Sequence, residues 1–130
     1  MGLSEKRKIK ELQDVTLAEL VKEIEDICVA AIPYDVNWHS FAGDIEGLNF
    51  MGNLSCHRPN MALRVICRDD MGKETVRDTI TKVKRKNVKT KPEMAISFAG
   101  GTLEMHCAHS LHTDGMHSDW EIGEMLVKKL

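Results

Sequence analysis

The sequence lacks long hydrophobic runs, a strong net charge and the common catalytic motifs. No apolar run approaches the ~20 residues needed to cross a membrane, and residues 1–14 are charged without the apolar segment of a signal peptide. We therefore expect a soluble, cytoplasmic protein. The formal net charge is only −2, so overall polarity does not predict binding to nucleic acid or to a membrane surface.

The missing motifs also argue against common classes of enzyme. The chain contains no phosphate-binding P-loop, no Gly-x-Gly-x-x-Gly, no Gly-x-Ser-x-Gly and no His-Glu-x-x-His. Cys56 and His57 could suggest a nucleophile beside a base, but adjacent side chains rarely meet and no carboxylate nearby would orient the histidine. We therefore predict no catalytic residue, and a binding function rather than an enzyme.

The cysteines are scattered through the chain and lie mostly within apolar patterns: Cys28, Cys56, Cys67 and Cys107. In a reducing compartment, isolated cysteines of this kind behave as small buried hydrophobic residues. The alternative is a secreted protein with two disulfides, but such proteins are usually smaller than this chain. The sequence therefore favours buried cysteines without disulfides.

The length and composition predict a single domain over residues 1–130. Hydrophobic residues make up 42% of the chain and charged residues 29%, which is ordinary for a folded globular protein. A chain of this size buries a sufficient core without disulfides or metals. Residues 4–13 predict a charged helix whose only apolar face is Ile9 and Leu12, so we expect residues 1–14 to dock loosely or to fray.

A strong amphipathic pattern predicts a helix over residues 16–30. Thr16 and Glu19 have the spacing of a capping box, in which each side chain satisfies a free backbone N–H. Pro33 disfavours helical geometry before it and ends the pattern. One apolar stripe follows the cap at helical spacing: Leu17, Leu20, Val21, Ile24, Ile27 and Cys28.

The middle of the chain predicts further helices around an irregular or extended connector at residues 32–40. Residues 41–51 and 73–80 have short helical patterns. Residues 61–68 fit either a helix or a buried strand, because short apolar runs are ambiguous by periodicity alone. Pro59 suits the first turn of a helix, so we favour the helix.

Residues 94–107 predict a β-hairpin. Alternate residues in each arm are apolar, and the pair Gly100-Gly101 supplies the positive φ angles of a two-residue turn. A strand within residues 81–88 would complete a small antiparallel sheet of three strands. Ser118 and Glu121 then have the spacing of a second capping box, which begins a closing C-terminal helix with a broad apolar face. The predicted fold class is α+β, with a helical N-terminal half, this small antiparallel sheet and the C-terminal helix.

Four of the six histidines and one cysteine lie between residues 106 and 117. Imidazole and thiolate are preferred ligands of zinc, so Cys107, His109, His112 and His117 form a candidate metal site. Such a site predicts a zinc-binding protein and, through a metal-bound water, a metal-dependent hydrolase. The spacing matches no standard zinc pattern, so ordinary histidines on a strand end and loop are favoured and no cofactor is required.

Residues 73–91 carry eight basic side chains and only two acidic ones. Lys82, Lys84 and Lys86 alternate along the predicted strand and suit phosphates; with Arg85 they are the candidate nucleic-acid-binding residues. No aromatic residue lies in the run for stacking on bases, and lysines commonly protect an edge strand. The sequence therefore favours a solvated, protective edge over nucleic-acid binding.

The leading functional prediction is a small intracellular binding domain that acts through a protein partner or by self-association as a homo-oligomer. It rests on the missing catalytic motifs, the ordinary charge and the small size. Zinc binding is the first alternative and weak nucleic-acid binding the second. The eight methionines fit core filling better than an adaptable binding surface.

Overall fold

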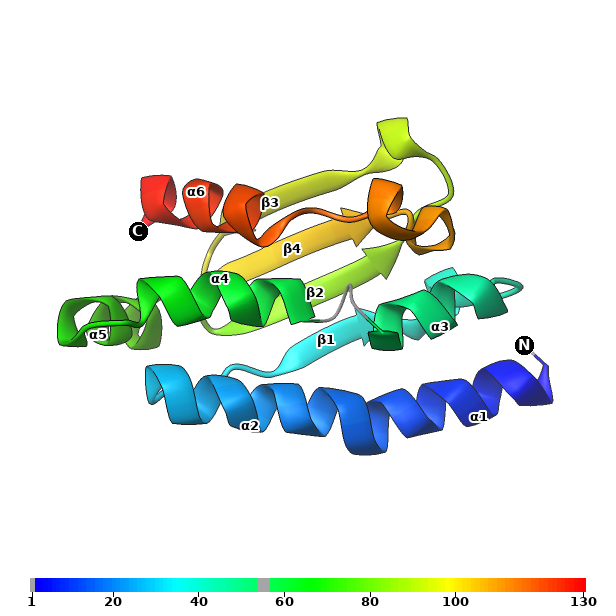
Figure 1. The fold of residues 1–130 in the computed structure, drawn as a ribbon, viewed down its shortest axis with the longest axis horizontal. Helices are drawn as coiled ribbons and strands as arrows, with labels where there is room; N and C mark the ends of the chain where they lie inside the picture. Colours follow the sequence, from blue (N-terminus) through cyan, green and yellow to red (C-terminus); the bar gives the residue numbers. More distant parts are fainter. Residues whose placement is uncertain (1, 54–56) are drawn as a thin grey trace.

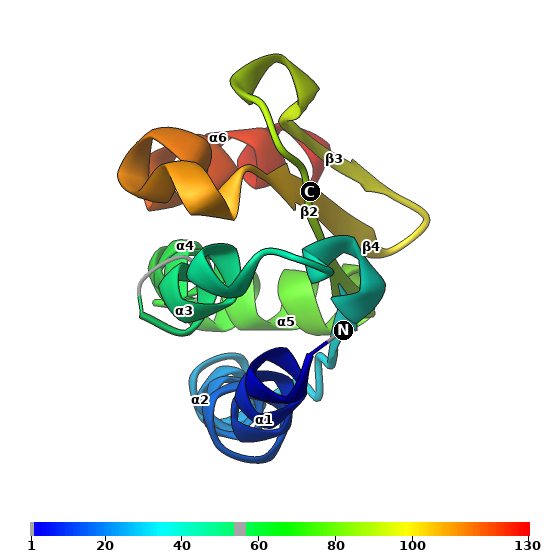
Figure 2. The same ribbon diagram turned by 90° about the vertical axis from the view of Figure 1, so that its right-hand side faces the viewer.

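The helices and the sheet form two layers in the computed structural model, which describes residues 2–53 and 57–130. Figure 1 shows the layer of α-helices in front of the sheet, and the perpendicular view in Figure 2 shows the α-helices on one side of it. The α+β class, the helical N-terminal half and the C-terminal helix are therefore confirmed. Within the described residues, no helix combines the length and the apolar character needed to span a membrane.

The helices in chain order are α1 (Leu3–Glu11), η1 (Leu12–Thr16), α2 (Leu17–Cys28), η2 (Trp38–Phe41), α3 (Ile45–Asn53), α4 (Arg58–Ile66), α5 (Asp70–Thr79), η4 (Lys91–Glu93), η5 (His109–Gly115) and α6 (Asp119–Lys129).

The strands form one mixed sheet in the order β1-β2-β4-β3. Both β1 and β4 run parallel to β2, whereas β3 and β4 form the predicted antiparallel hairpin. Gly100 and Gly101 make its turn with φ angles of 58° and 81°, so the hairpin prediction is confirmed. The strands are β1 (Tyr34–Asn37), β2 (Lys82–Asn87), β3 (Ala95–Ala99) and β4 (Thr102–Cys107).

This sheet differs from the expected three antiparallel strands in two respects. A fourth strand, β1, forms within the segment expected to be a connector, and β2 pairs with β4 in parallel. After β2 the chain returns as β3 one position further out, and β4 then fills the place between them. Alternation of apolar residues identifies a strand but not its neighbours, which is why the sequence pattern gave the wrong pairing.

The N-terminal helices form one continuous rod. α1 leads through the π-helical turn η1 into α2, and Thr16 itself has helical backbone angles, φ −63° and ψ −53°, without a capping hydrogen bond. The predicted capping box at Thr16 is therefore wrong, because no helix begins there. Leu12 at the junction is fully buried, whereas α1 buries none of its own residues.

The later helices follow the sequence patterns more closely. Residues 61–68 lie mainly in α4, as favoured, and the predicted helix 73–80 is α5. The cap at Ser118 is confirmed, since its Oγ accepts a hydrogen bond of 3.1 Å from the backbone N–H of Glu121. The predicted helix 41–51 is interrupted instead, because Gly43 has a φ of 76° between η2 and α3.

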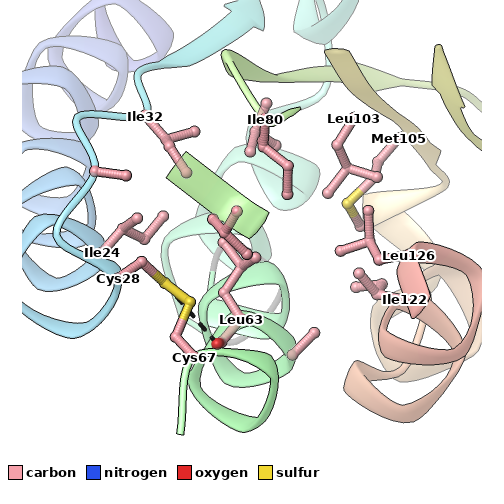
Figure 3. Packing of buried hydrophobic residues seen from close by; sticks show 14 of the residues in the cluster. Ile24, Cys28, Ile32, Leu63, Cys67, Ile80, Leu103, Met105, Ile122 and Leu126 are labelled. Atoms are coloured by element: carbon pink, nitrogen blue, oxygen red, sulfur yellow. Dashed lines mark hydrogen bonds between the residues drawn. A yellow bond between two sulfur atoms is a disulfide. The ribbon is translucent and has the colours of Figure 1, made fainter. Parts of the chain in front are cut away.

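Two clusters of buried side chains join the layers. The larger lies between the sheet and helices α2, α4, α5 and α6, and Ile24, Leu63 and Leu126 belong to it together with the sheet residue Leu103 (Figure 3). The smaller surrounds Phe41, between the N-terminal rod, β1 and α3. Each fully buried aliphatic side chain contributes about 1.5–3 kcal/mol to folding, so the larger cluster supplies most of the apolar stabilisation.

A disulfide joins Cys28, at the end of α2, to Cys67, directly after α4 (Figure 3). Their Cα atoms are 5.3 Å apart, and both residues are buried in the larger cluster. The prediction of cysteines without disulfides is therefore wrong for this pair, because packed helices bring together residues 39 positions apart. Cys107 is a buried free thiol. Cys56 lies outside the described residues.

Alternation along the strands divides the sheet into a covered face and an open face. Val83, Leu103 and Met105 point into the helical layer and are buried. Their strand neighbours point the opposite way, towards the side on which Figure 2 shows none of the α-helices. The open face therefore presents the polar residues Asp35 and Asn37 from β1, Lys82, Lys84 and Lys86 from β2, and Thr102, Glu104 and His106 from β4.

Candidate functional site

The four predicted zinc ligands lie at the end of β4 and in the segment after it, but each has different surroundings. Cys107 points into the apolar core and is fully buried. His109 is also fully buried, at the start of η5. His112 is exposed at the surface of η5, and His117 is buried just before α6.

His109 is the centre of a buried polar network. Its Nδ1 lies 3.1 Å from Oδ1 of Asn87, and its Nε2 lies 3.5 Å from Nη2 of Arg85. An amide oxygen only accepts and a guanidinium only donates, so Nδ1 donates to Asn87 while Nε2 accepts from Arg85. Asn87 donates in turn to the carboxylate of Asp44 (2.9 Å) and to the carbonyl oxygen of Ser40 (3.2 Å). The network ties β2 and β4 to the segment that leads into α3.

Burial keeps the His109 imidazole neutral. The pKa of His109 is lowered from 6.5 to about 3, first by desolvation and second by the charge of Arg85, while a backbone hydrogen bond involving Cys107 opposes the shift. Arg85 is itself only 1% exposed, and a buried guanidinium is tolerated only where acceptors meet it. Both ring nitrogens of His109 are therefore engaged in structural contacts, and a metal would have to displace Arg85 to reach Nε2.

His112 has an unusual backbone conformation, with φ 58° and ψ −130°. Few residues with a side chain adopt this region, and those that do are held there by their surroundings. Its ring stacks on Phe50, with the ring centroids 5.0 Å and the planes 7° apart, and its Nε2 lies 3.3 Å from the Glu46 carboxylate. These contacts fasten η5 to α3.

His117 links the sheet to the last helix. Its Nε2 lies 2.9 Å from the carbonyl oxygen of Ala95, at the start of β3, and its Nδ1 lies 3.3 Å from the carboxylate of Glu121 in α6. The side chain of His117 is only 6% exposed. The ring therefore bridges β3 and α6, and its nitrogens face protein acceptors.

In residues 2–53 and 57–130, no three His, Cys, Asp or Glu side chains form a group that could hold a metal ion. Zinc binding and metal-dependent hydrolysis stay predictions from the sequence, and the contacts above do not support them. We expect elemental analysis of protein purified without a histidine tag to find far less zinc than protein, unchanged after incubation with zinc. One zinc per chain, lost in a His117→Gln variant that still folds, would contradict this expectation.

The candidate nucleic-acid-binding residues separate onto both faces of the sheet. Lys82, Lys84 and Lys86 lie on the open face, whereas Arg85 alternates with them and points into the buried network. Because β2 lies between β1 and β4, its lysines do not protect an edge, and that interpretation is wrong. The three lysines instead lie on an internal strand of the open face, where protection of a sheet edge does not account for them.

A hollow of about 460 Å³ lies on this open face. Its lining comes from the three mutually parallel strands and is mostly polar and charged. His106 Nε2 lies 3.2 Å from the Glu104 carboxylate, which fixes one pair of side chains within it. The lining residues are Asp35, Asn37, Lys84, Arg85, Lys86, Glu104 and His106. We call this the polar hollow.

An apolar groove of about 360 Å³ lies between α4 and α6 in the helical layer. Ile122 and Leu126 point from α6 into the core, whereas Trp120 and Val127 point outward and remain largely exposed. The broad apolar face of the C-terminal helix was visible in the sequence, but its division into a buried and an exposed stripe was not. The groove is lined by Ala62, Val65, Ile66, Asp119, Trp120, Gly123, Glu124, Val127 and Lys128.

Comparisons with known proteins do not choose between these surfaces. The functional argument therefore rests on the chemistry of the polar hollow, the buried network and the apolar groove. No match to the chain was found among family models, curated proteins or solved structures.

Proposed function

We propose that this chain is a homotypic interaction domain, in which two copies associate through the apolar groove between α4 and α6. The supporting observation is the exposure of three large apolar side chains around one groove: Val65, Trp120 and Val127 are 60%, 69% and 65% exposed. Contiguous apolar surface of this kind marks interaction sites on folded proteins. Tryptophan is also enriched among the residues that dominate binding energy at interfaces.

The charges beside the groove favour a second copy as the partner. α4 carries Arg58 and Arg64 and no acidic residue, whereas α6 carries Asp119, Glu121 and Glu124. Within one copy Arg58 pairs with Asp119 (3.1 Å) and Arg64 pairs with Glu23 of α2 (3.6 Å), so the carboxylates of a second copy would add to these pairs or replace them. A two-fold axis along the groove would place α6 of each copy over α4 of the other. The acidic half of α6 would then face the basic α4 at two symmetry-related places, which is electrostatically complementary.

Gly123 offers a way to separate association from folding. Among the described residues, a Cβ at this position would meet only the Cβ of Ala62, at 3.9 Å, which is ordinary van der Waals contact. The fold therefore accepts a side chain here, and replacing a mid-helix glycine should stabilise the helix by about 1 kcal/mol. A long side chain would instead fill the groove that the second copy needs.

We expect wild-type protein to sediment as a dimer at micromolar concentrations and Gly123→Arg to sediment as a folded monomer. Trp120→Ala should raise the dimer Kd by a factor of roughly 30, equivalent to about 2 kcal/mol. The matched control is Val15→Arg, which adds the same side chain at an exposed apolar position on the N-terminal rod and should leave the dimer intact. A monomeric wild type at high concentration, or an unaffected Gly123→Arg dimer, would refute the proposal.

A charge exchange tests the identity of the partner. Glu124→Lys and Arg64→Glu should each weaken self-association, because each places like charges against the facing helix. Mixing the two variants should restore a heterodimer, since one α6–α4 contact is then native and the other has its charges exchanged. Failure of the mixture to associate would exclude this two-fold arrangement. The proposal does not depend on the cytoplasmic location expected from the sequence, which stays a prediction.

A further inference from the structure

We propose that the polar hollow on the open face of the sheet binds a small phosphorylated ligand that also carries hydroxyl groups. The phosphate would lie at Lys86 and Asn37, beside His106, and the hydroxyl groups would bond to Asp35 and Glu104. This site is on the opposite side of the sheet from the helical layer and its apolar groove, so it is independent of the proposed self-association.

The strand register arranges the lining residues in two rows of different charge. In the first row Lys84 lies between Asp35 and Glu104, so acidic residues are its register neighbours on both sides. In the second row Lys86 lies between Asn37 and His106, and the carboxylate nearest to this row, that of Glu104, is engaged by His106 Nε2. No ion pair of Lys86 with another described residue is present, and its ammonium group is therefore available to an anion.

The second row also has the donors that a phosphate requires. Lysine offers three N–H donors and Asn37 offers the N–H groups of its amide, whereas Nε2 of His106 is already engaged by the Glu104 carboxylate at 3.2 Å. Adjacent strands are about 4.8 Å apart, so the three side chains span about 10 Å, and a phosphate above Lys86 is within reach of both neighbours. Hydrogen bonds of this charge-assisted kind are stronger than neutral ones.

The position in the sheet agrees with a ligand site. Asn37 is the last residue of β1, and Lys86 and His106 are each one residue from the end of their strands. Ligands of open sheets with parallel strands bind outside the carboxyl ends of those strands, and the second row of the hollow lies next to that edge. On the far side of β4, the open-face positions of β3 hold only the small side chains of Ala95, Ser97 and Ala99. They leave that side of the hollow unobstructed.

The same residues argue against nucleic acid as the ligand. The lining contains no Phe, Tyr or Trp side chain on which a base could stack. Asp35 and Glu104 would also repel the next phosphates of a polyanionic strand, but they can accept hydrogen bonds from the hydroxyl groups of a small ligand. The volume of about 460 Å³ falls within the usual range for small-molecule sites.

Titration of the intact chain with simple probes tests this site. We expect amide and imidazole NMR signals of Lys86 and His106 to shift with inorganic phosphate and with glucose 6-phosphate, but not with glucose alone. Glucose 6-phosphate should bind about tenfold more tightly than phosphate, because only it can use the carboxylates. A single-stranded oligonucleotide should bind more weakly than glucose 6-phosphate.

Matched lysine variants give the decisive comparison. Lys86→Gln should weaken glucose 6-phosphate binding about tenfold, whereas Lys82→Gln, on the same strand face but outside the hollow, should change it less than about twofold. Asp35→Asn should reduce the preference for glucose 6-phosphate over phosphate. Equal effects of the two lysine variants, tighter binding of the oligonucleotide, or no phosphate-dependent shift at Lys86 and His106 would each overturn the proposal. Circular dichroism confirms that the variants at these surface positions remain folded.

Discussion

Acidification should destabilise the fold through His109, whose pKa is lowered from 6.5 to about 3 in the folded protein. Below pH 6.5 the unfolded chain binds a proton at this residue that the folded chain does not, so stability falls as the pH falls. The contribution is complete above pH 6.5 and decreases by about 1.4 kcal/mol per pH unit until the folded pKa is reached. Over this window the loss amounts to several kcal/mol, a large part of the stability of a domain of this size.

Urea unfolding at several pH values between 7 and 4 measures this effect. His109→Gln keeps an acceptor for Arg85 and a donor for Asn87 but cannot titrate. It should cost about 1–3 kcal/mol at neutral pH and lose less stability on acidification than the wild type. His39→Gln, at an exposed histidine, is the matched control and should follow the wild-type profile. Equal pH dependence in wild type and His109→Gln would show that other groups cause the acid sensitivity.

The sequence predicted the elements whose signals are local. The hairpin follows from alternation on either side of Gly100 and Gly101, and the start of α6 follows from Ser118, because a cap and a turn need only neighbouring residues. The capping box at Thr16 shows the limit of this reasoning. The same side chains fit equally well inside a helix that continues from α1, and the buried Leu12 favours that continuation.

The candidate sites were harder to predict, because they depend on which strands become neighbours. Grouping Arg85 with the lysines ignored the alternation that places it on the face of Val83, although the sequence itself contained that signal. Its contact with His109 joins β2 to the segment after β4, and only the parallel pairing of these strands brings the two residues together. The polar hollow likewise depends on β1, which the sequence pattern did not identify as a strand.

The tertiary pairing of cysteines leads to the second large prediction. Reduction of the Cys28–Cys67 disulfide should lower the free energy of unfolding by roughly 4 kcal/mol, because the unfolded chain regains the entropy of a loop with a sequence separation of 39. The expected loss is large because the bond closes a long loop, and it joins the ends of α2 and α4 within the same core. The sequences of α2 and α4 do not by themselves indicate that Cys28 and Cys67 pair.

Urea unfolding with and without a thiol reductant measures the contribution of the disulfide. The double variant Cys28→Ala/Cys67→Ala should unfold at lower urea than the oxidised wild type and should be insensitive to the reductant, which separates the bond from other effects of the reagent. Mass spectrometry of a non-reduced digest should contain a linked peptide pair with Cys28 and Cys67. The state of this pair in cells also tests the predicted cytoplasmic location, because glutathione keeps most cytosolic cysteines reduced. A wild type whose stability does not change on reduction, or a digest without the linked pair, would contradict the disulfide and return both cysteines to the role of buried hydrophobic residues.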